Sequence, residues 1–207
     1  MKIILSKAGK MPCHSYSLPA EACKTGSKLA KVDGSVCANC YAKKGMYRFK
    51  NVKRVREQNL DSLPVSGGSW EEWITAMASH LLSSGESYFR WFDSGDIQSV
   101  EMLAAITEVA KRTPAIKHWL PTHEVGIVRR FLAGSGGFPD NLRVRVSAAM
   151  VNGEPTRSYK FTSTVRTLES LQRGTTEFVC PSRNQGNSCG ACRACWSEIP
   201  RVAYVYH

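Results

Sequence analysis

Short apolar runs alternate with amphipathic stretches along much of the chain. From residue 86 onward the apolar or β-branched runs recur about every 25 to 35 residues, which is the rhythm of βαβ units. The runs that predict strands span residues 88–92, 116–120, 142–146 and 176–179. Residues 3–5 and 202–206 are expected to be the first and last strands, so the pattern predicts an α/β fold with six strands in a parallel sheet.

The clearest helix is predicted at Trp70–Ser83, where apolar side chains recur on one face. Ser69 and Glu72 have the spacing of a capping box at its start. Further helices are predicted at residues 52–60, 99–111, 124–132 and 162–172. The glycine and proline clusters Gly67-Gly68 and Gly134–Pro139 are expected to be loops.

The predicted strand order also places the unusual residues. Parallel α/β sheets bind their ligands in the loops that follow the C-terminal ends of the strands. Here those loops hold Cys13, Asp93–Asp96, Thr122–Glu124, Ser147–Asn152 and Cys180. We therefore expect the cysteines and these polar loops to share one face of the sheet.

Composition favours one domain that holds metal. A chain of 207 residues with 43% hydrophobic content suits a single α/β domain over residues 1–207. No segment reaches the roughly 20 apolar residues of a membrane span, and the first residues lack a signal-peptide pattern. We therefore expect a cytoplasmic protein without a membrane partner, in a compartment where eight cysteines act as ligands rather than disulfides.

The C-terminal cysteines have the spacing of an iron–sulfur site. Cys189, Cys192 and Cys195 are each separated by two residues, and the remote Cys180 precedes Pro181. Bacterial ferredoxin segments bind a [4Fe–4S] cluster through a similar triplet and a Cys-Pro, although there the Cys-Pro follows the triplet. Zinc sites more often use two separated pairs of ligands, so this group favours a cluster over zinc.

The N-terminal cysteines are Cys13, Cys23, Cys37 and Cys40, of which only the last two form a C-x-x-C pair. All four could bind a second cluster or a zinc ion. Alternatively, three of them could bind a cluster and leave one iron open to a substrate or cofactor.

Several segments resemble one bacteriophage family. They are Cys23–Ala30, Cys37–Ala42, Phe89–Asp96, His118–Thr122 and Cys189–Trp196, and together they look like the family called gene product 88. The resemblance covers nearly the whole chain and implies a protein of a phage-infected cell, in the host cytoplasm. It implies no settled activity.

More distantly, the layout resembles radical S-adenosylmethionine enzymes, although the diagnostic C-x-x-x-C-x-x-C run is missing. This resemblance implies a partial TIM barrel of about six βα units with cysteine-rich loops. It also implies a cluster on Cys23, Cys37 and Cys40, S-adenosylmethionine at the turn Ser94, Gly95 and Asp96, and reductive cleavage of that cofactor at an open iron. The C-terminal cysteines would then hold an auxiliary cluster.

For some polar residues near these loops, the sequence is compatible with two different roles. Asp93 and Asp96 could orient a substrate, or Asp96 could cap the helix that follows. His123 and Glu124 are acid–base candidates by position, but helix capping explains them better.

The net charge of +11 comes almost entirely from residues 1–60. The segment Lys43–Arg56 interleaves basic residues with Tyr47 and Phe49, which suits nucleic-acid contact by phosphate neutralisation and base stacking. A solvated helix face that offsets cluster charge explains it equally well. The sequence thus predicts an iron–sulfur protein, with a nucleic-acid-binding phage protein or a zinc-stabilised scaffold as alternatives.

Overall fold

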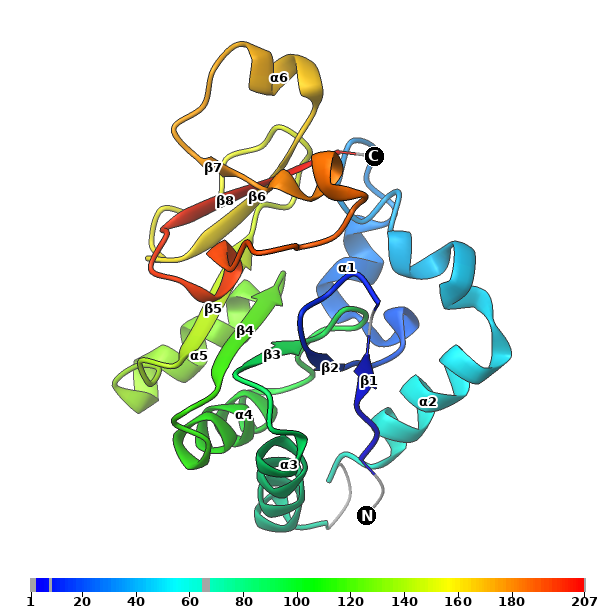
Figure 1. Cartoon of the computed structure of the whole chain (residues 1–207), viewed down its shortest axis with the longest axis vertical. Coiled ribbons are helices and arrows are strands. Elements are labelled where there is room, and N and C mark those ends of the chain that lie inside the picture. Colours follow the sequence, from blue (N-terminus) through cyan, green and yellow to red (C-terminus); the bar gives the residue numbers. More distant parts are fainter. Residues whose placement is uncertain (1–2, 8, 65–67, 207) are drawn as a thin grey trace.

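A computed structural model describes residues 3–7, 9–64 and 68–206. Eight strands form one mixed sheet in the order β1-β2-β3-β4-β5-β6-β8-β7 (Figure 1). The strands are β1 (Ser6–Lys7), β2 (His14–Tyr16), β3 (Tyr88–Trp91), β4 (Lys117–Thr122), β5 (Leu142–Ser147), β6 (Thr162–Arg166), β7 (Phe178–Val179) and β8 (Arg201–Val205). Only β1 and β2 pair antiparallel. Because β1 and β7 are edges in this order, the sheet is open, and the prediction of a TIM-barrel-like sheet is not confirmed.

The described residues contain six α-helices. They are α1 (Lys24–Leu29), α2 (Lys50–Asp61), α3 (Trp70–Ser84), α4 (Val100–Arg112), α5 (Val125–Ser135) and α6 (Leu168–Gln172). The short 3₁₀ turns are η1 (Ala20–Ala22), η2 (Tyr41–Lys43), η3 (Gly45–Arg48), η4 (Pro181–Gln185) and η5 (Ala194–Trp196). The Ser69 hydroxyl accepts a bond from the Glu72 amide, which confirms the predicted start of α3. Helices α3, α4 and α5 pack side by side against the sheet (Figure 1).

The strands separate two chemically different faces. Successive side chains of a strand point to opposite sides, so alternate positions face the helices. Phe89, Trp91 and Val144 join the main apolar core beneath α3–α5. Tyr88 and Trp119 pack instead into a second cluster with the C-terminal cysteine loop. We call this second side the inner face.

The predicted helix over residues 162–172 is wrong in its first half. Residues Thr162–Arg166 form strand β6, and only Leu168–Gln172 are helical. The β-branched residues Thr162, Thr164 and Val165 favour an extended chain, and parallel pairing with β8 stabilises it. The Thr167 hydroxyl then caps α6 by accepting a bond from the Ser170 amide.

The predicted first strand over residues 3–5 is also wrong. Ile4 uses its amide and carbonyl to bond the side-chain amide of Asn59 on α2, both at 2.9 Å. These two bonds replace those of a neighbouring strand, and the sheet begins instead with the β1–β2 hairpin. Of the predicted Gly67-Gly68 loop, Gly67 lies outside the described residues.

A neutral histidine is built into the core between β3, β4 and the end of α4. The Trp91 indole N–H points at His118 Nδ1 over 3.3 Å, so this nitrogen must accept. Nε2 then donates to the Thr113 hydroxyl at 2.8 Å, and that hydroxyl donates to the Val109 carbonyl. Burial lowers the pKa of His118 to about 3.

This arrangement predicts a loss of stability in acid. The unfolded chain binds a proton on this histidine below about pH 6.5 whereas the folded chain does not, so stability falls as the pH drops from about 6 toward 4. We expect the free energy of unfolding of a His118→Gln variant to fall less steeply, by on the order of 1 kcal/mol per pH unit. Urea unfolding of both proteins at several pH values measures the two slopes, and parallel slopes would contradict the assignment.

Candidate functional site

Three cysteines meet beside α1. Cys23 is the residue before that helix, and Cys37 and Cys40 lie in one turn in which the Cys40 amide donates to the Cys37 carbonyl. A Cβ atom on Gly26 would lie 3.6 Å from the Sγ atoms of both Cys23 and Cys37. The Cys40 thiolate is close enough to raise the pKa of both other thiols. We call Cys23, Cys37 and Cys40 the three-cysteine group.

The electrostatics of this group favour a cation. Burial raises the pKa of Cys23 to about 12 and that of Cys37 to about 11, and the carboxylate of Asp96 adds to both shifts. Thiols with raised pKa values are not activated nucleophiles. They bind as thiolates only where a cation compensates their charge, as a metal centre does.

The remaining five cysteines lie together on the inner face. Cys13, Cys180, Cys192 and Cys195 belong to one cluster of packed side chains, and Cys189 lies near enough to raise the pKa of Cys13. The Cys189 amide donates to the Lys10 carbonyl at 3.0 Å, which connects the C-terminal loop to the β1–β2 hairpin. We call these residues the five-cysteine group.

This grouping corrects two sequence-based expectations. Cys13 lies with the C-terminal cysteines and not with Cys23, Cys37 and Cys40, because the β1–β2 hairpin turns the chain back toward the inner face. Cys13 lies in the turn between β1 and β2, directly before β2. The five-cysteine group packs on the inner face, so the expectation that the cysteines share one face with the polar loops is not confirmed for this group.

Arg145 holds the C-terminal cysteine loop in place. Its guanidinium is fully buried on β5 and donates to the carbonyls of Ala194, Cys195, Ser197 and Pro200 at 2.9 to 3.3 Å. Burial lowers its pKa. The Trp196 indole adds a bond to the Phe89 carbonyl at 2.8 Å. The loop is therefore fixed by bonds to its backbone, which leave the thiols of Cys189 and Cys192 available.

A second arginine on the inner face lacks an anionic partner. Arg90 of β3 donates to the Tyr41 hydroxyl at 3.1 Å and lies 4.6 Å over the Trp119 ring. Its Nε is buried without a hydrogen-bond partner, and it forms no ion pair within the described residues. Its charge lowers the pKa of Cys13 and Cys189, so it lies close to the five-cysteine group. A partly buried cation of this kind is stabilised by an anionic group beside it.

The turn Ser94, Gly95 and Asp96 follows β3 and packs tightly against Leu18. Gly95 has a φ of +79°, and a Cβ there would approach the Leu18 carbonyl oxygen to 2.8 Å, so only glycine fits. Ser94 exchanges two bonds with the Leu18 backbone.

The carboxylate of Asp96 is engaged within the protein. It accepts bonds from the Ile97 amide, the His123 amide and the Thr122 hydroxyl. Burial nevertheless raises the pKa of Asp96 to about 7. Its side chain thus joins the ends of β3 and β4, and the helix after it is capped by Ser99 instead.

Glu124 connects this region to the three-cysteine group. Its carboxylate accepts bonds from the Thr25 amide at 2.6 Å and the Thr25 hydroxyl at 2.7 Å. Glu124 therefore caps α1, which is distant in the chain, and positions the residues next to Cys23. Sequence reasoning missed this pair because the two residues are 99 positions apart.

Asp93 is also occupied by protein groups. Its carboxylate bonds Ser17 and lies 3.3 Å from the Tyr47 hydroxyl and 3.5 Å from Arg56. The Tyr41 hydroxyl donates to its carbonyl at 2.6 Å. These bonds join the segment after Cys40 to the loop after β3.

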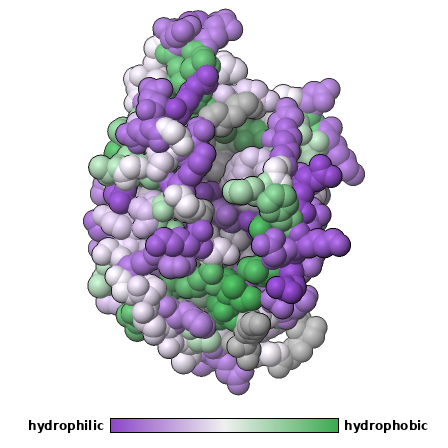
Figure 2. Space-filling view, turned by 45° about the vertical axis from the view of Figure 1, so that its right-hand side comes forward, coloured by the Kyte–Doolittle hydropathy of each residue, from purple (hydrophilic) through white to green (hydrophobic). Residues whose placement is uncertain are grey.

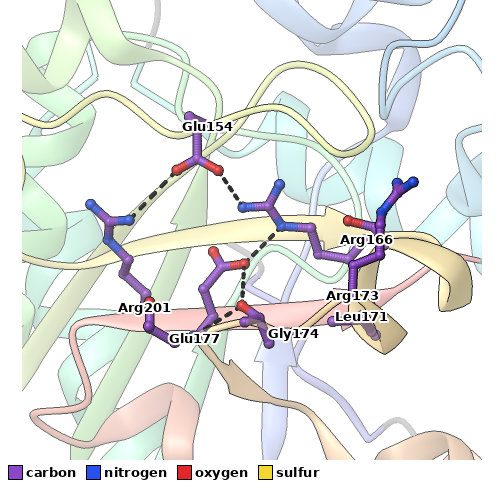
Figure 3. A pocket seen from close by; sticks show the side chains of 10 residues that line it. Glu154, Arg166, Leu171, Arg173, Gly174, Glu177 and Arg201 are labelled. Carbon is purple, nitrogen blue, oxygen red and sulfur yellow. Dashed lines mark hydrogen bonds and ion pairs between the residues drawn. The ribbon is translucent and has the colours of Figure 1, made fainter.

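A large cavity of about 590 Å³ lies elsewhere, between α6 and the end of β6. Figure 3 shows that its charged groups face one another. Arg166 pairs with Glu177 at 2.7 Å and with Glu154 at 2.6 Å, and Arg201 approaches Glu154 at 3.6 Å. Because these charges compensate each other, the ion pairs account for the charged side chains of this cavity without a bound ligand.

The described residues contain no group of three or more His, Cys, Asp or Glu side chains arranged to hold a metal ion. All eight cysteines are free. The soft sulfur donors nevertheless fit iron–sulfur chemistry, and Arg90, whose buried Nε lacks a hydrogen-bond partner, fits an anionic centre beside the five-cysteine group.

The open sheet and the two cysteine groups define a cysteine-rich α/β protein. The chain belongs to the gene product 88 family, whose family model matches residues 3–198. No curated protein and no solved structure matches the chain. None of the helices in the described ranges has both the length and the apolar character that crossing a membrane requires.

The anchoring role of Arg145 gives a testable prediction. Arg145→Met leaves four carbonyls without their donor, and we expect a loss of about 3 kcal/mol or more in the free energy of unfolding. Urea unfolding of the protein measures it, and alkylation of Cys192 and Cys195 followed by mass spectrometry should become faster in the variant.

The control is Arg143→Met on the same strand and face. Arg143 pairs with the exposed carboxylate of Glu198 and bonds no backbone carbonyl among the described residues, so its removal should cost clearly less than the removal of Arg145. Equal losses in the two variants would show that Arg145 does not anchor the loop specifically.

Proposed function

We propose that the protein is an iron–sulfur protein in which the three-cysteine and five-cysteine groups each hold a [4Fe–4S] cluster. The observation that carries the proposal is the division of eight free cysteines into two groups with mutually perturbed thiols. Buried thiols gathered in this way stay protonated, and they become thiolate ligands only where a metal centre compensates their charge.

The spacing of the thiols favours clusters over single zinc ions. Four thiolates on one zinc ion all lie about 2.3 Å from the same point. The thiolates of a four-iron cluster bind different irons and are spread more widely. The spacing of Cys189, Cys192 and Cys195 along the chain is the observation that favours the second arrangement.

The five-cysteine group has one more thiol than a four-iron cluster requires. Cys195 is the most enclosed of the C-terminal thiols, and its Sγ lies 3.2 Å from the Tyr204 hydroxyl. Cys13 enters from the opposite end of the chain. We propose that Arg90 offsets the negative charge of this centre and thereby raises its reduction potential.

Three ligands would leave one iron of the other cluster open, and a cluster of this kind can supply electrons to a bound cofactor. We propose that S-adenosylmethionine binds at this open iron, and that the turn Ser94, Gly95 and Asp96 forms part of its site. The open sheet would then correspond to part of a TIM barrel. The support is that Asp96 is close enough to influence both Cys23 and Cys37. Since the side chains of Ser94 and Asp96 are engaged within the protein, this turn would act mainly through its backbone.

The first test is metal content. Protein purified without oxygen should contain about eight irons and eight sulfides, with a broad visible absorption band. Cys37→Ser and Cys189→Ser should each remove about half of the iron, because they lie in different groups. Ser188→Ala is the control beside Cys189 and should keep all of it. Stoichiometric zinc without iron would overturn the proposal and favour a zinc-stabilised scaffold.

The enzyme reading has a separate test. Reduced, iron-loaded protein should retain S-adenosylmethionine in equilibrium dialysis, and Cys37→Ser should abolish retention whereas Cys189→Ser should not. Iron-loaded protein that retains no S-adenosylmethionine would contradict the hypothesis of a radical enzyme, but not the iron–sulfur proposal.

Nucleic-acid binding is the second candidate function. The observation that favours it is the exposure of large side chains within the basic segment Lys43–Arg56 and just before it: Met46 is 71% exposed, Phe49 58% and the preceding Tyr41 55%. Exposed aromatic rings between cations suit stacking on unpaired bases. Retention of single-stranded DNA that weakens steeply with salt would support it.

A further inference from the structure

A small pocket lies between α2, the turns η2 and η3, and the loop before η1. Its volume is about 270 Å³, near the lower end of small-molecule sites. Four basic side chains line it, from residues Lys43, Arg48, Lys53 and Arg56. We call it the basic pocket. Figure 2 turns the α2 side toward the reader and shows strongly hydrophilic side chains along that edge.

The cations of this pocket are only partly compensated. In the part of the chain that the structure describes, Lys43, Arg48 and Lys53 form no ion pair. Two carboxylates, Glu21 and Glu57, also line the pocket and offset part of the charge. The balance stays positive, in contrast to the self-paired cavity beside α6.

Arg56 gives the pocket a fixed donor. Its side chain is only 8% exposed, and its guanidinium lies 4.4 Å over the Tyr47 ring. Within the described residues its one hydrogen bond is a long contact of 3.5 Å to Asp93. A buried guanidinium has five N–H donors, so most of them lack a protein acceptor while the side chain lines a cavity. Such a planar, oriented fork matches the oxygens of a phosphate.

We propose that the basic pocket binds the phosphate group of a phosphate monoester, with Arg56 as its buried fork and Lys43, Arg48 and Lys53 around it. A monoester carries up to two negative charges, which suits several cations converging on one small volume. The Tyr47 ring is covered by Arg56, and it packs edge-to-face with Tyr41 at a centroid distance of 5.5 Å. Tyr47 therefore lines the pocket and is not free to stack on a base.

The pocket is also next to the three-cysteine group. Ser94 lines it, two residues before Asp96, and Ala42 lines it, two residues after Cys40. A phosphate held here would therefore direct the rest of its ligand along the loop after β3. This proposal goes beyond the iron–sulfur proposal and does not depend on it, since it requires no metal.

The test is binding of adenosine 5′-monophosphate to the protein as purified, measured by calorimetry. We expect adenosine, which lacks the phosphate, to bind at least about tenfold more weakly, which corresponds to about 1.4 kcal/mol. The double variant Arg48→Ala/Lys53→Ala should weaken nucleotide binding by about tenfold or more without changing the iron content. Arg56→Lys keeps the charge but loses the fork, and should also weaken binding.

The matched control is Lys50→Ala/Arg54→Ala, which removes the same charge from exposed positions that do not line the pocket. It should change nucleotide binding by less than about twofold. Equal weakening in the two double variants would reduce the effect to general electrostatics and overturn the proposal. Equal binding of adenosine and its monophosphate, or binding of neither, would also overturn it.

A further comparison identifies the source of the phosphate. Two single-stranded DNA oligonucleotides of one sequence, with and without a 5′-phosphate, are titrated alongside the nucleotide. Tighter binding of the 5′-phosphorylated strand assigns the pocket to a strand end, and preference for the free nucleotide assigns it to a small substrate. Equal binding of both strands with no binding of the nucleotide would mean contact with the nucleic-acid backbone, and would overturn the monoester site.

Discussion

A buried arginine determines how the C-terminal cysteine loop is placed. Arg145 donates to four backbone carbonyls around η5, and it forms no ion pair among the described residues. An enclosed guanidinium is tolerated only where acceptors satisfy it, so the loop and the arginine need one another. The packing of Trp196 on Trp119 and Tyr88, and with it the position of the five-cysteine group, follows from this contact.

The inner face has an unusual chemical character. The interior of a TIM barrel is filled by layers of branched apolar side chains. Here the corresponding face of the open sheet carries Arg90, Arg143 and Arg145 beside aromatic rings and thiols. Positive charge on the strands therefore faces thiols that would become negative if they bound a metal, as proposed above. The iron–sulfur proposal and the phosphate proposal rest on the same kind of observation. In each, positively charged side chains lie together with too few carboxylates to balance them.

The apolar periodicity of the sequence predicted those helices and strands whose formation depends mainly on nearby residues. The helices α3 and α4 and the strands β3, β4 and β5 were predicted within about two residues, because their apolar periodicity is strong. Strand β6 was missed because Phe161, Val165 and Leu168 also have helical spacing, and its pairing with β8 is invisible locally. The Asn59 side chain bonds the backbone of Ile4 in place of a neighbouring strand, and residue propensities do not predict such a contact.

The candidate site was predictable in its residue types but not in its grouping. Cysteine spacing identified all eight candidate ligands, yet Cys13 changes group because a hairpin reverses the chain. Arginines alternating with apolar residues in Arg143–Val146 were a usable signal, since arginine is rarely buried without a purpose. The Thr25–Glu124 pair depends on tertiary packing and had no sequence signal. The basic segment Lys43–Arg56 indicated the cations of the basic pocket, but their convergence on one small volume depends on tertiary packing.

The contact between the β1–β2 hairpin and the cysteine loop also sets an order in time. Met11 and Cys189 are 178 positions apart, although their sulfur atoms lie 3.7 Å from each other. At roughly 5 to 20 residues per second, a ribosome needs about 10 to 35 s to make the intervening chain. Cys13 must wait that long for its neighbours, whereas Cys23, Cys37 and Cys40 emerge close together and the segment before Cys37 pairs with residues 149–151. The three-cysteine group can therefore assemble once about three quarters of the chain has been made, and the five-cysteine group only when its last cysteines have emerged.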